Sequence, residues 1–190
     1  MKARDLEAEP AAPCAKGHAG AFILQNREAL SGAVSAVYRF SMSLPTLPLE
    51  QFEAATAGLG DTEAERLVRA RIGQDIFRAA LLEYWNATCP LTAITDKSLL
   101  RASHIVPWAD CTSDAQRLDA HNGLLLSALW DAAFDDGLLS FDDDGRVLVS
   151  PLLSDAAATE LGVECAPVLK LQPGHRNNLA YHRANVWRVG

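Results

Sequence analysis

The feature that most constrains the fold is a strand–strand–helix order between residues 99 and 137. Leu99–Val106 is a short apolar run closed by Pro107, and Gly123–Leu126 is a second apolar run. Short apolar runs bounded by Pro or Gly are typical of buried strands. The following segment, Ser127–Phe134, has the composition of a compact helix. The order predicts a small palm of two strands and one helix, which can hold one metal ion against a phosphodiester.

Each element of this palm carries one polar residue with useful chemistry. His104 lies on the first strand, Asn122 stands at the start of the second, and Asp131 lies on the helix. An imidazole with a pKa near 6.5 is largely neutral at neutral pH, so His104 is a candidate general base that activates water. A carboxylate between Trp130 and Phe134 should be partly buried and needs a partner, which makes Asp131 a candidate metal ligand.

The same residues carry a family resemblance that is specific in order and spacing. It extends over roughly residues 70 to 188 and includes Gln74, Phe77 and Arg78 upstream. The chain resembles a branch of the HNH endonucleases in the following segments: Ala102-Ser103-His104-Ile105-Val106-Pro107-Trp108, Arg117-Leu118-Asp119, Asn122-Gly123-Leu124-Leu125-Leu126, Asp131–Gly137, Ser140-Phe141-Asp142-Asp143-Asp144-Gly145 and Tyr181-His182-Arg183.

The resemblance implies a ββα-metal fold and assigns a role to each polar residue. His104 would be the general base, and the Asn122 amide would tie the loop between the strands to the helix or orient the imidazole. Asp131 stands where the family has its final His. As a hard oxygen ligand it suits Mg²⁺ or Mn²⁺, which are the expected cofactors.

The chain departs from the family pattern at two places. Many family members carry Asp or His just before the general base, and this chain has Ser103. Either another carboxylate, Asp135 or Asp119, completes the metal site, or metal affinity is low, or cleavage has been lost. Cys89 is followed by Thr92 where a second Cys of a CxxC pair would stand, so no structural zinc is expected.

The expected fold class is α+β, with a helical or mixed N-terminal region before the ββα-metal module, an added β-hairpin and C-terminal helices. The boundaries expected are 1–60 for a region of unknown role and 61–190 for the nuclease domain, with its core motif at 99–137. The first twenty residues, rich in Ala, Pro and Gly, are expected to be mobile.

Several further elements are predicted. Thr62 and Glu65 have capping-box spacing ahead of a helix that ends near Trp85 to Asn86. Asp142 to Gly145 favours a hairpin turn. The remaining predictions are a strand or hairpin from Ala21–Leu24 and Val34–Met42, an end to regular structure at Pro45 and Pro48, strands at Leu138–Phe141 and Arg146–Val149, and helices at Leu152–Leu161 and His175–Trp187.

Charge argues against a broad phosphate-binding surface. The chain has 17 Lys and Arg against 24 Asp and Glu, a net charge of −7, whereas nucleic-acid-binding proteins usually neutralise several phosphates. Trp108 and Trp130 are either core residues or stacking platforms. The candidate nucleic-acid contacts, for which a solvated surface is the alternative, are Arg101, His121, Arg176, His182 and Arg183.

The leading hypothesis is a metal-dependent endonuclease that hydrolyses DNA, with RNA as the open alternative, in a restriction or other defence system. The second is a catalytically silent HNH-like module that binds nucleic acid or protein. The third is a toxin or defence subunit whose N-terminal region recruits a partner that supplies DNA-binding charge. No apolar run is long enough for a membrane span or signal peptide, so a cytoplasmic protein is expected, with reduced thiols. A homodimer is possible, because cutting both strands symmetrically needs two sites.

Overall fold

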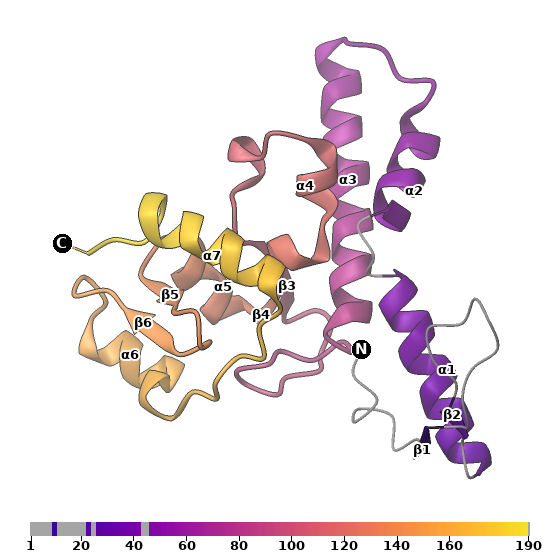
Figure 1. Ribbon diagram of the computed structural model, residues 1–190. Coiled ribbons are helices and arrows are strands. Elements are labelled where there is room, and N and C mark those ends of the chain that lie inside the picture. The colour runs from indigo at the N-terminus through magenta and orange to yellow at the C-terminus, as the bar shows by residue number, and fades with distance from the viewer. Residues whose placement is uncertain (1–8, 11–21, 24–25, 43–45, 190) are drawn as a thin grey trace. The chain divides into compact units, whose positions relative to one another are not determined.

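The computed structural model describes residues 9–10, 22–23, 26–42 and 46–189 (Figure 1). Contacts divide the chain into two compact units, one ending at Ser41 and one beginning at Met42. The expected mobility of residues 1–20 concerns positions that, apart from 9–10, lie outside the described residues. The predicted domain boundary at residue 61 stays a prediction; α2 (Thr46–Thr56), which precedes it, packs within the second unit.

The first unit contains a helix where a strand was expected. Strands β1 (Glu9–Pro10) and β2 (Phe22–Ile23) pair antiparallel, and α1 spans Arg27–Met42. The predicted strand at Val34–Met42 is therefore wrong. The Asn26 side chain caps the helix by accepting a hydrogen bond from the backbone N–H of Ala29 at 2.8 Å, and such a cap favours the start of a helix.

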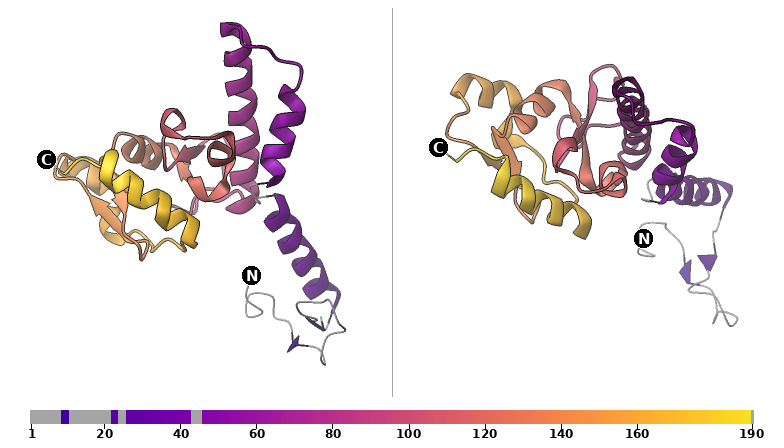
Figure 2. Two further views of the ribbon diagram at one scale, coloured as in Figure 1. Left: turned by 45° about the horizontal axis from the view of Figure 1, so that its top comes forward. Right: turned by 90° about the horizontal axis from the view of Figure 1, so that it is seen from above.

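The second unit begins with two helices that pack side by side (Figure 2). Helix α2 carries Pro48 in its first turn, so the prediction that Pro48 ends regular structure is wrong. A proline is tolerated in the first turn because the N–H that it lacks would have no partner within the helix. Pro45 lies outside the described residues. Helix α3 spans Glu63–Tyr84 and begins with the predicted capping box of Thr62 and Glu65.

The predicted palm is confirmed. Strand β3 (Leu100–His104) pairs antiparallel with β4 (Gly123–Ser127), so that His104 lies opposite Gly123 and Ser103 opposite Leu124. Helix α5 (Ala128–Asp135) follows β4 directly and packs on β3. The chain between the two strands forms η2 (Trp108–Asp110), α4 (Asp114–Leu118) and η3 (Ala120–Asn122).

The C-terminal part adds the predicted hairpin and helices. Strands β5 (Leu139–Phe141) and β6 (Val147–Val149) pair antiparallel around a turn in which Gly145 has φ +88°, a value that favours glycine. Helix α7 (Pro173–Asn185) lies beside β5, as Figure 1 shows. The remaining elements are α6 (Asp155–Leu161) and η4 (Val163–Cys165).

The core forms where α3 and α5 cover the β3–β4 pair. Leu124, Leu125 and Leu126 are all fully buried, which shows that β4 has both faces covered. A Cβ at Gly123 would lie 2.5 Å from the Phe77 ring, so α3 can approach β4 closely only because residue 123 has no side chain. The fold class is α+β, as predicted.

Two other expectations concern the chain as a whole. In the described part, no helix combines the length and the apolar character that crossing a bilayer requires. Cys89, Cys111 and Cys165 are free thiols, and Cys14 lies outside the described residues.

Candidate active site

His104 stands at the end of β3 between two aromatic rings. Its imidazole stacks on Phe77 of α3, with ring centroids 3.8 Å apart and an angle of 15° between the planes. Trp108 meets it edge-on, with centroids 5.5 Å apart and planes at 89°. These two contacts from separate elements fix the orientation of the ring.

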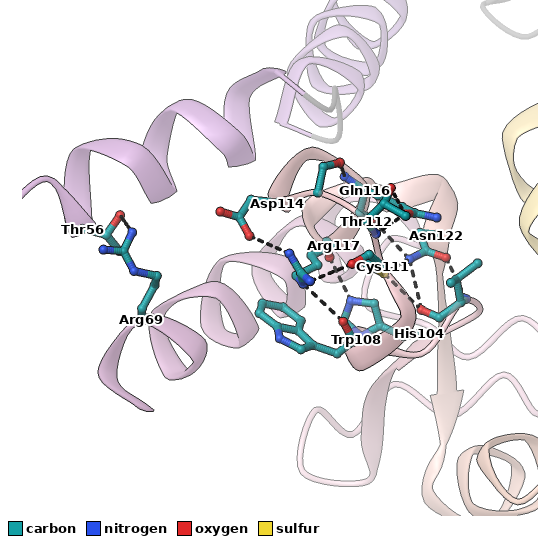
Figure 3. Close-up of polar contacts among 12 residues, drawn as sticks. Thr56, Arg69, His104, Trp108, Cys111, Thr112, Asp114, Gln116, Arg117 and Asn122 are labelled. Carbon is teal, nitrogen blue, oxygen red and sulfur yellow. Dashed lines mark hydrogen bonds and ion pairs between the residues drawn. The ribbon is translucent and has the colours of Figure 1, made fainter. Parts of the chain in front are cut away.

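The backbone carbonyl of Arg117 determines which nitrogen of His104 carries the proton. His104 Nε2 lies 2.8 Å from this oxygen, which can only accept a hydrogen bond, so Nε2 is the donor (Figure 3). Within the described part of the chain, no group bonds Nδ1. Burial lowers the pKa of His104 below its usual range and keeps the ring neutral. Nδ1 therefore offers a lone pair that can accept a proton from water.

The Arg117 side chain holds the segment that supplies this carbonyl. Its guanidinium donates to the backbone oxygens of Trp108 at 3.2 Å and Cys111 at 2.7 Å, and pairs with Asp114 at 3.0 Å. It also lies 5.7 Å from the centre of the Trp108 ring. Arg117 thus supports the site through the loop that it braces.

Asn122 is fully buried and bonds the same loop. Its Oδ1 accepts from the N–H of Val106 at 2.8 Å, and its Nδ2 donates to the carbonyl of Val106 at 3.3 Å. Nδ2 also donates to the carbonyl of Gln116 at 3.2 Å (Figure 3). Gln116 is the neighbour of Arg117, so Asn122 ties the segment that follows β3 to the residue before the one that His104 contacts. Its amide groups are occupied by backbone, which makes it a positioning residue.

Two carboxylates from α5 face Ser103 of β3. Asp131 and Asp135 are one helical turn apart, and the Ser103 hydroxyl donates to Asp135 Oδ1 at 3.1 Å. Burial, followed by repulsion from Asp135, raises the pKa of Asp131 to about 6, and burial raises the pKa of Asp135. Ser103 and Arg101 act in the opposite direction on Asp131. The pair is a local excess of negative charge.

The chemistry of these donors fits a hard divalent cation. Among the described residues, no three His, Cys, Asp or Glu side chains form a metal-binding group. Asp131 and Asp135 would supply two carboxylate oxygens and Ser103 a hydroxyl. Mg²⁺ is commonly held by one or two carboxylates, with water and phosphate oxygens as its other ligands. Asp119 does not join this group, because its carboxylate caps η3 and pairs with His121 at 3.4 Å.

Two clefts border His104. One, of about 340 Å³, is lined by His104, Trp108 and Asp135, together with Ala102, Pro107, His182 and Val186. The other, of about 290 Å³, lies on the side of α3. His104 therefore stands where a substrate can approach, with one of the two carboxylates in the same cleft.

The predicted nucleic-acid contacts are dispersed. Arg101, His121, Arg176 and Arg183 line neither of these two clefts. Arg101 donates to backbone carbonyls of Ser98 and Leu100, and Arg176 to the carbonyl of Asp143. Arg183 bonds the Phe141 carbonyl and the Asp143 carboxylate, each at 2.7 Å.

His182 lines a cleft but is only 1% exposed. Its ring stacks on Phe134 with centroids 4.0 Å apart, and its two nitrogens bond Ser140 Oγ and the Phe134 carbonyl. Neither nitrogen is left for a phosphate. Trp130 is 2% exposed and belongs to the core, whereas Trp108 is half-buried beside His104.

Sequence reasoning gave no role to Arg117 or to the stacking of Phe77 under the imidazole. Arg117 lies within a motif that carries the resemblance, yet its contribution runs through a backbone carbonyl, which a side-chain pattern does not reveal. Phe77 lies 27 positions before His104 in the chain, and the resemblance included Phe77 without indicating that its ring would contact the imidazole.

Comparison with known proteins agrees with this geometry. A family model described as HNH endonuclease matches residues 89–142, which span the β3–β4 pair, the intervening loop, α5 and the start of the hairpin. No curated protein matches the chain. Residues 89–142 of this chain are therefore similar to the HNH endonuclease family.

Proposed function

We propose that this protein is a metal-dependent endonuclease that hydrolyses phosphodiester bonds in DNA, with His104 as the general base. The observation that carries the proposal is the fixed tautomer of His104. Its Nε2 donates to the Arg117 carbonyl, and its free Nδ1 belongs to a ring that borders a cleft shared with Asp135. A base held in one orientation beside an acidic pair is what phosphodiester hydrolysis requires.

The chemical step would proceed as follows. Nδ1 of His104 takes a proton from a water molecule, whose oxygen attacks the phosphorus in line as the bond to the leaving oxygen breaks. The proton that remains on His104 places a positive charge on a ring whose Nε2–H already bonds a carbonyl, and this bond strengthens as the charge develops. A divalent cation held by Asp131 and Asp135, with Mg²⁺ or Mn²⁺ as the candidates, would neutralise charge on the phosphate and leaving oxygens.

Plasmid nicking tests the proposal. His104→Ala should lower the Mg²⁺-dependent or Mn²⁺-dependent nicking rate by about 10²- to 10⁴-fold, the usual contribution of a general base. Asn185→Ala is the control, because the exposed Asn185 amide bonds the Tyr181 carbonyl within its own helix and borders neither cleft, and its nicking rate should stay near that of the parent protein. Equal rates for parent and His104→Ala, with both proteins folded by circular dichroism, would show the proposal to be wrong.

A second candidate is a catalytically silent module that binds nucleic acid or a protein. It is favoured by Ser103, a neutral hydroxyl at the position beside the base, and by the restriction of the ionisable ligands to two carboxylates. Calorimetric titration with Mn²⁺ separates the candidates. Metal binding that is lost in Asp131→Asn supports the nuclease, and a protein that binds DNA without binding metal or cutting supports the silent module.

The most specific part of the proposal concerns the protein's role and location in the cell. A restriction or other defence role, in the cytoplasm, fits an enzyme that cuts DNA and carries free thiols at Cys89, Cys111 and Cys165. A host expressing the protein should then resist incoming phage or unmodified plasmid, and His104→Ala should remove the resistance.

A further inference from the structure

The second cleft beside His104 combines cationic and polar side chains from one face of α3. Its volume is about 290 Å³. Four of its lining residues, Arg71, Gln74, Asp75 and Arg78, recur at helical spacing, and Phe77 of the same helix lies beneath the imidazole. The wall is completed by Ala102 and His104 of β3. The cleft thus begins at the proposed base and runs toward a row of side chains that can bind an anion.

Arg78 is held in place by the neighbouring backbone. Its Nη1 donates to the carbonyl of Leu100 at 2.9 Å and its Nη2 to the carbonyl of Lys97 at 2.7 Å. A guanidinium has five N–H donors in a rigid plane, and these two bonds leave others for a ligand. A cation fixed in this way loses little conformational entropy when it binds an anion.

The group that would compete with a phosphate for Arg71, the Asp75 carboxylate, is held only weakly. Its Nε lies 3.6 Å from the Asp75 carboxylate, and the two side chains are 76% and 65% exposed. Exposed ion pairs contribute little free energy. Arg71 can therefore exchange Asp75 for a phosphate at small cost, and Asp75 remains as the one acidic group of this cleft.

The two clefts that border His104 differ in the charge of their lining residues. The cleft on the α5 side contains Asp135, whose carboxylate repels a bare phosphate, and its lining residues include no Lys or Arg. The cleft on the α3 side contains two arginines. The net charge of −7 argues against a broad phosphate-binding surface. Two arginines in one cleft can nevertheless bind a single phosphate next to the one that reacts.

We propose that the α3 cleft binds the DNA phosphate adjacent to the scissile one, with Arg71 and Arg78 as its cationic contacts and Gln74 as a neutral donor. This inference rests on the proposed nuclease function. It assigns α3, which lies outside the segment that matches the family, a direct part in substrate binding. Arg71, Gln74 and Arg78 then determine how the strand crosses His104.

Fluorescence anisotropy with a short fluorescein-labelled DNA duplex tests this assignment, in Mg²⁺ and in the His104→Ala background so that the duplex stays intact. Arg71→Glu should weaken binding about tenfold and lower the slope of log K against log salt by about one. Arg66→Glu is the matched control, since Arg66 is an exposed residue of the same helix that lines neither cleft. Asp75→Asn should tighten binding about threefold, because it removes the acidic group that competes for Arg71.

The outcomes separate this inference from the proposed nuclease function. Equal weakening by Arg71→Glu and Arg66→Glu, or none by either, overturns the assignment, and nicking by the parent protein would then still support the nuclease. Binding that depends on Arg71 in a protein that never nicks DNA supports the assignment and overturns the nuclease. A duplex that does not bind at all, while single-stranded RNA binds with the same dependence on Arg71, overturns DNA as the ligand.

Discussion

The Nε2 atom of His104 lies 2.8 Å from the backbone carbonyl oxygen of Arg117. This contact selects one tautomer of the imidazole and leaves Nδ1 as the proton acceptor. It also makes the candidate base dependent on the loop between β3 and β4, because the position of Arg117 is set by its own guanidinium bonds and by the buried Asn122 amide. The chemistry of one side chain is thereby linked to the stability of a segment that carries no reacting group.

Asn122→Ala should destabilise the protein by about 3 kcal/mol or more, since it leaves the buried Val106 N–H and the Gln116 carbonyl without their partner. Urea unfolding measures the change. At a temperature where the variant is folded, we expect its kcat for nicking to fall while the Kd for Mn²⁺ is unchanged, because the amide positions the loop and binds no metal.

Asn185→Ala is the control for this change. The Asn185 amide is exposed on α7 and bonds the Tyr181 carbonyl within its own helix, so its loss should cost less than about 0.5 kcal/mol. A destabilisation of Asn122→Ala as small as that of the control would contradict the bracing role.

Asp131→Asn and Asp135→Asn should each weaken Mn²⁺ binding by at least about tenfold, because each removes one of two charged oxygen donors. Each should also raise the melting temperature measured in EDTA, since burial and then repulsion between the two carboxylates raise the pKa of Asp131, and each substitution removes one of these charges. Isothermal titration and thermal unfolding provide the two readings. Asp136→Asn is the matched control, since the Asp136 carboxylate pairs with Arg188 at 2.8 Å. Metal binding that is lost equally in all three variants would refute the assignment of the ligands.

Gly73→Ala should destabilise the protein, although alanine favours a helix by about 1 kcal/mol over glycine. A Cβ at residue 73 would lie 2.5 Å from the Trp108 ring and 3.4 Å from Phe52. Overpacking of this kind usually costs about 1 to 3 kcal/mol. Because Trp108 also contacts His104 edge-on, we expect the nicking rate to fall in parallel with the melting temperature.

Gly32→Ala provides the comparison for this steric effect. Gly32 lies within α1, and a Cβ there meets nothing within 4 Å. The substitution should leave the melting temperature unchanged or raise it. A Gly73→Ala variant as stable as Gly32→Ala would show that Trp108 shifts without cost.

Stability should fall as the pH is lowered from about 6.5 to about 4, in part through His175. Burial, followed by repulsion from His121, lowers the pKa of His175 to about 4. The unfolded chain binds a proton at this residue near pH 6.5, whereas the folded protein does not until about pH 4, so acid favours unfolding across that window. The loss is on the order of 3 kcal/mol and is complete below pH 4.

His175→Asn tests this pH dependence. The substitution keeps an acceptor close to the position of Nδ1, which accepts a hydrogen bond from the Gln172 backbone N–H at 3.1 Å. It removes the titrating group, so the free energy of unfolding, measured by urea between pH 5 and pH 7, should depend less on pH than in the parent protein. An unchanged slope would assign the acid sensitivity to other groups.

The sequence by itself predicted the elements whose signals are local. The capping residues Thr62 and Glu65 predicted the start of α3, and the turn at Asp142 to Gly145 predicted the hairpin. Periodicity was a weaker guide at the N-terminus, where the strand expected at Val34–Met42 is part of a helix capped by Asn26. The cap that favours this helix lies eight residues before Val34.

The order of strand, strand and helix also determined, from sequence alone, that His104, Ser103 and the α5 carboxylates belong to one small module. Only the tertiary structure decided which of them meet and in what state. Phe77 and Arg117 fix the orientation and tautomer of His104 from distant elements, and close packing joins Ser103 to Asp135 and raises the pKa of Asp131. The sequence shows which chemical groups are present and how they are spaced along the chain. Hydrogen bonding and desolvation depend on distances that arise only when separate elements pack together.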